Sequence, residues 1–221
     1  MRRLSFWLLF FFLLSCNHYS DHETDRAGKQ TIALVNLGDD QTQITRVIKT
    51  RLENTVYCNI LLLDTKPLPL NAYNPLRDRY KADSLLVFLS KQKPTHAQKI
   101  IGITSVDIET RNGFVKSWGV MGLGYCPGSS CVASTFRPKK SAKNQGHFLD
   151  RMFILVMHEL GHTYSLDHCR DTTCIMQDAH GKMRLDNSAG YCKRCKQALE
   201  GKGFVLNTNH AQGYSQHTEN K

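Results

Sequence analysis

The stretch from Phe148 to His168 reads FLDRMFILVMHELGHTYSLDH and combines the clearest helical pattern of the chain with its strongest chemical motif. Its apolar residues recur with helical spacing and fall close to one face, which predicts a helix over Phe148–Ser165. His158 and His162 stand four positions apart, so a helix places both imidazoles within reach of one ion. The stretch is therefore predicted to be a metal-binding helix.

Each residue of the H-E-x-x-H motif has a chemical role that its spacing explains. Glu159 adjoins the first histidine and faces the open side of the ion, where it can take a proton from a metal-bound water. Three neutral imidazoles leave the fourth position of a tetrahedral Zn2+ for that water, whose pKa the metal lowers toward about 7. His168 continues the extended motif and supplies the third ligand from just past the helix end. The alternative, a surface helix with two solvated histidines, leaves His168 unexplained.

Four cysteines after the third histidine form a second metal-binding pattern. Cys169 and Cys174 make a C-x4-C pair, and Cys192 and Cys195 make a C-x2-C pair after a loop. These spacings are typical of zinc, and four thiolates around the ion would make a closed, structural site. Two disulfides in an oxidising compartment are the alternative, which the C-x2-C spacing disfavours. We therefore expect two Zn2+ ions per chain, one catalytic and one structural.

The run H-E-x-x-H-x-x-x-x-x-H-C-x4-C-x-M, followed by C-x2-C, resembles the archaemetzincin family of zinc metallopeptidases. The similarity extends from about Thr31 to Phe204 and includes the segments Gly102–Asp107 and Asn112–Val115. The resemblance implies a compact metzincin-like domain of mixed α/β (α+β) class, in which a cleft separates an upper α/β part from a smaller lower part. It also implies catalytic zinc ligands at His158, His162 and His168, a general base at Glu159, structural zinc ligands at Cys169, Cys174, Cys192 and Cys195, and a Met-turn methionine at Met176, the apolar floor beneath the metal.

One position departs from the family pattern. Ser165 stands where that pattern has glycine, at the sharp turn between the second and third histidines. Because non-glycine residues are disfavoured at positive φ, we expect either another turn geometry or a slightly strained turn at Ser165. Asp167 precedes His168 and is a candidate to orient it or to replace it as a ligand, but the histidine is favoured as the ligand.

Two function classes follow from these sites. The first is a zinc metallopeptidase, in which a zinc-activated water attacks a peptide carbonyl while Glu159 takes and returns the proton. The second is a lipid-anchored zinc-binding scaffold with lost or marginal peptidase activity. Glu159 favours the enzyme, because a purely structural three-histidine site needs no carboxylate there.

Outside the motif the chain alternates between strand and helix patterns. Short apolar runs predict strands, and runs with helical spacing predict helices. The expected strands are Thr31–Leu37, Asn59–Leu63, Lys99–Asp107 and Cys131–Phe136, with a strand edge or bulge at Gly119–Gly124. The other expected helices are Thr42–Tyr57 and Tyr80–Ser90. This order predicts a small mixed sheet with helices packed on it.

The chain begins with a pattern typical of a bacterial lipoprotein signal. A basic start precedes an apolar run of about eleven residues, too short to span a bilayer, and Cys16 follows it. We expect residues 1–15 to be removed and Cys16 to carry lipid, in preference to an ordinary secretory signal or a buried helix. Residues 16–30 then form a lipidated tether, residues 31–206 the catalytic domain and residues 207–221 a polar tail. The protein would be exported, anchored to the membrane through its N-terminal lipid alone, and face the periplasm or the surface.

Length, composition and charge exclude some classes of protein and indicate which partners to expect. The 221 residues suffice for one domain, and 41% hydrophobic residues exclude wholesale disorder. No apolar stretch reaches the roughly 18 residues of a membrane span, which excludes an integral membrane protein. The net charge of +10 favours acidic partners or an anionic surface. The basic residues at 137–143 are not interleaved with aromatic ones, and the expected export also argues against a nucleic-acid partner. The metallopeptidase interpretation implies a peptide or protein substrate, and we expect a monomer.

The remaining cysteines and histidines receive simpler interpretations. Cys126 and Cys131 enclose a short Pro-Gly loop and are a candidate disulfide in an exported protein. Cys58 would then remain free and buried. His147 and His180 are expected to be surface residues rather than metal ligands.

Overall fold

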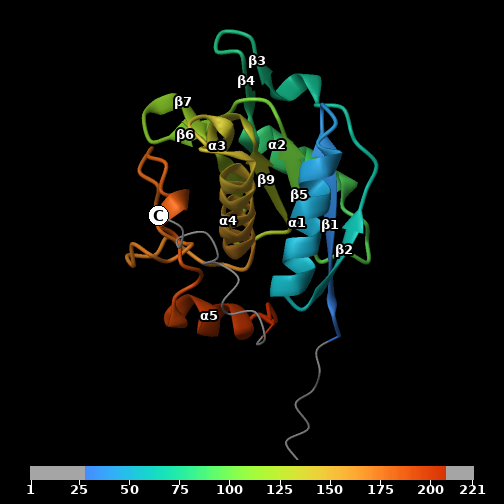
Figure 1. The fold of residues 1–221 in the computed structure, drawn as a ribbon. Coiled ribbons are helices and arrows are strands. Elements are labelled where there is room, and N and C mark those ends of the chain that lie inside the picture. The colour runs from blue at the N-terminus through green and yellow to red at the C-terminus, as the bar shows by residue number, and fades with distance from the viewer. Residues whose placement is uncertain (1–27, 208–221) are drawn as a thin grey trace, which may run out of the picture.

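The structure is a computed structural model that describes residues 28–207. The predicted signal at residues 1–15, the lipidated Cys16, most of the tether and the tail from residue 208 onward lie outside this part. Figure 1 shows a central sheet flanked by helices, a smaller sheet toward the top of the view, and the last helix at the bottom. The predicted mixed α/β class is confirmed.

Nine strands and seven helices make up the described part. The strands are β1 (Gln30–Leu37), β2 (Cys58–Leu62), β3 (Tyr73–Asn74), β4 (Arg79–Lys81), β5 (Lys99–Thr104), β6 (Ile108–Asn112), β7 (Val115–Val120), β8 (Gly122–Gly124) and β9 (Ser130–Ser134). The helices are α1 (Thr42–Thr55), α2 (Ala82–Gln92), α3 (Phe136–Lys139), α4 (Gln145–Thr163) and α5 (Lys193–Glu200), with the 3-10 turns η1 (Leu70–Ala72) and η2 (Leu185–Asn187).

A five-stranded sheet forms the centre of the domain, in the order β2-β1-β5-β9-β8. The first four strands run parallel, and β8 is an antiparallel edge strand. Side chains alternate along β1: Ile32 and Leu34 face the core cluster that includes α1 and α4, while Ala33 and Val35 face the cluster around α2. Because helices cover both faces, these strands are nearly continuous apolar runs, which is why their sequence pattern was sufficient to predict them.

A second sheet, in the order β3-β4-β6-β7, lies beside the first. The segment Gly119–Gly124, predicted as a strand edge or bulge, is the junction where the chain leaves β7 of the small sheet and becomes β8 of the large one. Asp107 precedes β6 and accepts hydrogen bonds from Arg79 at 2.9 Å and Arg137 at 2.8 Å. These ion pairs join the small sheet to α3.

The longest helix, α4, packs against β8 and β9 and carries the H-E-x-x-H motif. Asn144 caps its start by accepting a hydrogen bond from the N–H of His147 at 2.9 Å. At its other end, the ammonium of Lys99 donates to the carbonyl of Thr163 at 2.8 Å, a favourable position for a cation. The predicted helix Phe148–Ser165 is confirmed with slightly shifted ends, because these caps lie outside the apolar pattern.

The predicted disulfide between Cys126 and Cys131 is wrong. Both thiols are free in the structure. In the β8–β9 pair, Gly124 rather than Cys126 stands opposite Cys131, whose side chain is buried in the core. The exposed thiol of Cys126 faces the carbonyl of Leu166 at 3.6 Å. The short loop between the two cysteines suggested a disulfide, but the register of the β8–β9 pair does not place them opposite each other. Cys58 is free and buried, as predicted.

The C-terminal part contains α5, which the apolar pattern did not indicate. After this helix the chain returns to α1, where the N–H of Tyr57 donates to Val205 at 2.8 Å and the N–H of Asn207 donates to Thr55 at 2.9 Å. Of the helices described between residues 28 and 207, none combines the length and apolar character that crossing a membrane requires.

Candidate metal centres and cleft

Three histidines from two segments converge beside α4. His158 and His162 project from the helix and His168 lies on the loop after it, with one ring nitrogen of each within 4.8 Å of the others. The Nε2 atoms of His158 and His162 are 3.1 Å apart. Two nitrogens at about 2.05 Å from a tetrahedral Zn2+ would lie about 3.3 Å apart. The residues predicted to bind the catalytic ion are therefore arranged in a way that fits zinc.

Hydrogen bonds prepare two of these rings for metal binding. Nδ1 of His158 donates to the carbonyl of Ile175, and Nδ1 of His162 donates to the carbonyl of Leu166, both at 2.7 Å. A carbonyl oxygen only accepts, so Nδ1 carries the proton and Nε2 keeps its lone pair. Burial lowers the pKa of His158 to about 3 and also lowers the pKa of His162. Both imidazoles are therefore neutral, as metal ligands must be.

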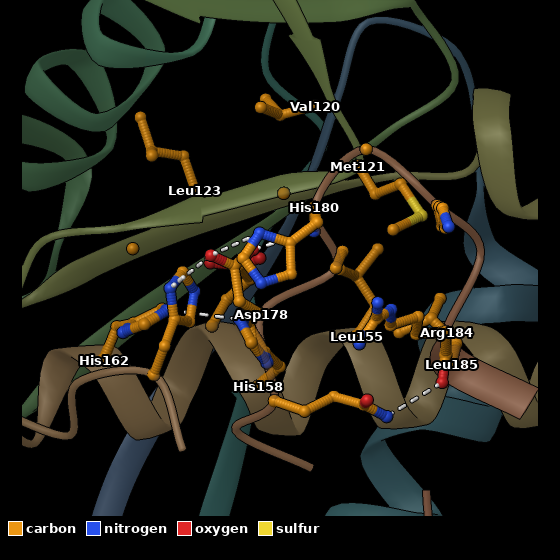
Figure 2. A pocket seen from close by; sticks show the side chains of 18 of the residues that line it. Val120, Met121, Leu123, Leu155, His158, His162, Asp178, His180, Arg184 and Leu185 are labelled. Atoms are coloured by element: carbon orange, nitrogen blue, oxygen red, sulfur yellow. Dashed lines mark hydrogen bonds and ion pairs between the residues drawn. The ribbon is translucent and has the colours of Figure 1, made fainter. Parts of the chain in front are cut away.

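The third histidine faces a carboxylate that sequence spacing did not indicate. Nδ1 of His168 lies 3.5 Å from Oδ2 of Asp178, and His180 lies 3.4 Å from the same oxygen. Figure 2 shows Asp178 and His180 over the two histidines of α4. A carboxylate behind a metal-binding histidine holds the orientation of its ring. Asp178, rather than Asp167, makes this contact with His168.

The turn between the second and third histidines is strained, as Ser165 has a φ of +66°. We expect Ser165→Gly to raise the free energy of unfolding by about 0.5–1 kcal/mol, because glycine relieves the left-handed strain but makes the unfolded chain more flexible. The Tm of the zinc-loaded protein should rise by about 2 °C. The control is Ser188→Gly, at a φ of −80°, which should lower the Tm. Equal shifts in the two variants would contradict strain at Ser165.

Met176 lies beneath the histidines and is fully buried. A Cβ atom at Gly161 would lie 2.5 Å from its Sδ atom, so glycine lets the thioether approach α4 between His158 and His162. The carbonyl of Met176 accepts a hydrogen bond from the N–H of Cys169 at 2.7 Å. The methionine therefore occupies the place where the apolar floor is expected and connects it to the cysteine cluster.

Glu159 is buried under the edge strand, with 5% of its surface exposed. A Cβ atom at Gly122 would lie 2.4 Å from Oε1 of Glu159, so β8 approaches the carboxylate closely. Burial raises the pKa of Glu159 to about 8. Within residues 28–207 the carboxylate has no hydrogen bond or ion pair. A buried carboxylate without partners is unfavourable for stability, which points to a chemical role.

These groups open onto one cleft with a volume of about 710 Å³, within the usual range of ligand-binding sites. The cleft is lined by α4, by the strands around the junction between the two sheets, and by the loop after the methionine floor. Figure 2 shows Val120 and Leu123 on one side and Leu155 and Leu185 on the other.

The four cysteines predicted to bind structural zinc form a second cluster. Their sulfur atoms lie within 4.8 Å of one another, and all four thiols are free. The Sγ atoms of Cys169 and Cys192 are 3.8 Å apart. Two sulfurs at about 2.3 Å from a tetrahedral Zn2+ would have this separation. The structure therefore contains a four-thiol cluster that fits zinc, and not the alternative pair of disulfides.

Hydrogen bonds to the sulfurs favour their ionised form, whereas burial raises the pKa of Cys174 to about 11 and also raises that of Cys195. Nη2 of Arg194 donates to Sγ of Cys169 at 3.2 Å, and the N–H of Cys192 donates to Sγ of Cys174 at 3.4 Å. Burial opposes ionisation of Cys169, but hydrogen bonds from the N–H of Asp171 and from Arg194 outweigh it and lower its pKa. Arg194 thus offsets part of the negative charge that four thiolates bring. Its position inside the C-x2-C pair is the only sequence signal for this role.

A three-histidine site with a buried glutamate, opening onto a cleft of this α/β fold, defines a zinc metallopeptidase. Residues 37–201 match the family model described as Peptidase family M54. The chain belongs to this family, the archaemetzincins, and its reaction is the hydrolysis of peptide bonds.

Individual relatives agree with this assignment. The archaemetzincin of Natronomonas pharaonis is 30% identical over 174 residues, which cover 74% of this chain and 97% of the relative. The archaemetzincin of Methanopyrus kandleri is 33% identical over 135 residues, which cover 60% of this chain and 73% of the relative. The crystal structure of the Methanopyrus kandleri protein aligns with a TM-score of 0.67 at 27% identity, over 80% of this chain and 97% of the other. The structure of the Archaeoglobus fulgidus archaemetzincin shares the fold, with a TM-score of 0.65 at 22% identity. The alignment covers 76% of this chain and 99% of the other.

Proposed function

We propose that this peptidase uses two separate zinc ions with different roles. His158, His162 and His168 hold the catalytic ion, the four cysteines hold a structural ion, and Glu159 is the general base. The observation that carries the proposal is the buried carboxylate of Glu159 next to three ring nitrogens that lie within 4.8 Å of one another.

The side chains of the cleft supply proton transfer and alignment. When bound by the three histidines, zinc supplies Lewis acidity, which polarises the peptide carbonyl and makes a water nucleophilic near neutral pH. Glu159 accepts the proton of the attacking water and returns it to the leaving amine. The carbonyls of Ile175 and Leu166 hold two imidazoles in orientation, so little reorganisation is needed on binding.

The alternative, a zinc-binding scaffold without peptidase activity, is disfavoured by the same carboxylate. Glu159 is buried without a partner among residues 28–207, and its burial lowers stability unless it contributes to catalysis. A scaffold would need only the histidines and cysteines.

Elemental analysis of the purified domain tests the two zinc sites. We expect two zinc ions per chain in the parent and one in His162→Ala, because this variant removes a ligand from only one cluster. The parent should cleave peptides and the variant should not. A parent with one zinc that the variant loses would mean that the cysteines bind no metal. A parent with one zinc that the variant keeps would mean an empty histidine site and would favour the scaffold.

We also propose that the protein is an exported lipoprotein held at the membrane by lipid on Cys16. The support is the order of basic start, short apolar run and cysteine at the beginning of the chain. Cells grown with labelled palmitate should label the protein, and Cys16→Ala should abolish the label and release the protein from the membrane. An unlabelled protein whose Cys16→Ala variant stays membrane-bound would contradict the proposal.

A further inference from the structure

The cleft carries basic side chains that the proposed catalysis does not use. Arg111 on β6, Arg137 on α3, and Lys182 and Arg184 on the loop after the methionine floor all line it. Asp107 binds Arg137 through hydrogen bonds of 2.8 and 3.0 Å. In the part of the chain that the structure describes, the other three form no ion pair. Three cations of the cleft thus have no ion-pair partner among residues 28–207.

Arg184 is half-buried and directly precedes η2, which packs against α4. Two residues after it, Asp186 accepts hydrogen bonds from Arg151 of α4 at 2.6 and 2.7 Å. Arg151 precedes His158 by two helical turns, which is about 10 Å along the helix. Leu155 lies between Arg151 and His158 along α4. Figure 2 shows the side chain of Arg184 reaching toward Leu155. The guanidinium is therefore placed along the cleft, a short distance from the histidines.

None of the three acidic side chains that line the cleft forms an ion pair with Arg111, Lys182 or Arg184 in the described part of the chain. Asp178 faces two histidines at 3.5 and 3.4 Å. Asp167 lies beside Cys126, with Oδ1 3.8 Å from its Sγ atom, and Glu159 lies under the edge strand. The end of the cleft that contains Arg184 consequently has a positive potential, which attracts an anionic group of a ligand.

The same end is bounded by a contact between the loop and β7. A Cβ atom at Gly181 would lie 3.2 Å from the ring of Trp118, so the loop packs against this strand. The half-buried Arg184 therefore lines the cleft together with the apolar side chains of Leu155 and Leu185, and the exposed Lys182 lies at its rim. Charge-assisted hydrogen bonds are stronger where water is partly excluded.

We propose that this end of the cleft binds a carboxylate of the peptide substrate, with Arg184 as the main partner and Lys182 and Arg111 as flanking charges. A guanidinium binds a carboxylate through two parallel hydrogen bonds. The carboxylate belongs to an acidic side chain or to the C-terminus, within about three residues of the cleaved bond, because an extended chain advances about 3.3 Å per residue. The inference rests on the proposed function and adds the substrate class: peptides with a carboxylate close to the scissile bond.

The preference for peptides with a carboxylate close to the scissile bond can be measured as binding affinity. The zinc-loaded Glu159→Gln protein is used because it should bind peptides without cleaving them. The probes are acetylated, fluorescent six-residue peptides in which one Gln is replaced by Glu at each position in turn, each with a free or an amidated C-terminus. We expect the favoured carboxylate peptide to bind about five- to tenfold more tightly than the neutral one. An advantage of Glu over Gln identifies a side chain as the source, and an advantage of the free acid over the amide identifies the C-terminus.

Two cleft variants and one control decide the outcome. Arg184→Gln should reduce the affinity advantage of the carboxylate peptide over the neutral one to less than about twofold. Lys182→Gln should reduce this advantage in part, because the Lys182 side chain is exposed. Arg46→Gln removes the same charge from α1, outside the cleft, and should leave the advantage unchanged. Equal binding of neutral and carboxylate peptides, or an advantage that both cleft variants keep, overturns the inference. A binding preference that persists while the parent chain cleaves none of the peptides would contradict the peptidase mechanism instead.

Discussion

Glu159→Gln should lower kcat for peptide cleavage by about a thousandfold while both zinc ions stay bound. A general base contributes about 10²- to 10⁴-fold, and an amide cannot accept the proton of the attacking water. Glutamine has the shape of glutamate, so it fits the narrow space beneath Gly122, and the substitution removes no candidate metal ligand. Steady-state kinetics at saturating peptide, together with elemental analysis of zinc, measures both parts of the prediction.

The matched control is Glu200→Gln, on the exposed side of α5, which should leave kcat unchanged. Turnover by Glu159→Gln at the rate of the parent would mean that another group is the base. Loss of zinc along with activity would instead give the carboxylate a role in holding the metal.

The same variant should show a pH-dependent difference in stability once zinc is removed with a chelator. Burial raises the pKa of Glu159 from 4.5 to about 8, so the folded protein holds a proton that the unfolded chain has released. The free energy of unfolding of the parent should therefore fall as pH rises from about 4.5 to about 8, and that of Glu159→Gln should fall less. Parallel curves for the two proteins would contradict the raised pKa.

Cys174→Ala should remove the structural zinc and lower the Tm by about 10 °C. The thiol is almost fully buried, and its loss leaves three sulfurs that cannot close a tetrahedral site. Breaking a metal site in a domain of this size should lower the free energy of unfolding by about 3–5 kcal/mol. Each kcal/mol lowers the Tm by about 2–4 °C. The next residue, Ile175, holds the ring of His158, so zinc affinity at the histidine site should fall as well.

Cys58→Ala is the control, because it removes an equally buried sulfur outside the cluster. It should keep two zinc ions per chain and lower the Tm by less. Calorimetry with and without chelator, together with elemental analysis, separates the two variants. Two zinc ions in Cys174→Ala, or equal losses of Tm in the two variants, would show that the cluster does not hold a structural metal.

Much of the site follows from local spacing. His158 and His162 meet because four residues make about one helical turn, and His168 returns to them across a short turn. Cys169 follows His168 directly, so the two predicted clusters share one segment of chain. The apolar runs that become β1, β5 and β9 also predict strands from local pattern, since each of these strands is buried on both faces, whereas the edge strand β2 is buried in part.

Other features depend on contacts between distant residues. The predicted disulfide fails because register, set by pairing along the whole β8–β9 hairpin, buries Cys131 opposite Gly124. The carboxylate of Asp178 reaches His168 only because the loop after Met176 folds back over α4. No short spacing encodes that return.

The amino-acid order was therefore sufficient for the family, for the candidate metal-binding clusters and for the main helix, because each depends on neighbours within a few turns of chain. The depth at which Glu159 is buried, the partners of the histidine rings and the basic end of the cleft emerge only when strands, helices and loops from separate parts of the chain pack together. Burial and pairing set the pKa of a side chain and its availability to a ligand, and both are properties of its surroundings in space rather than of its neighbours in sequence.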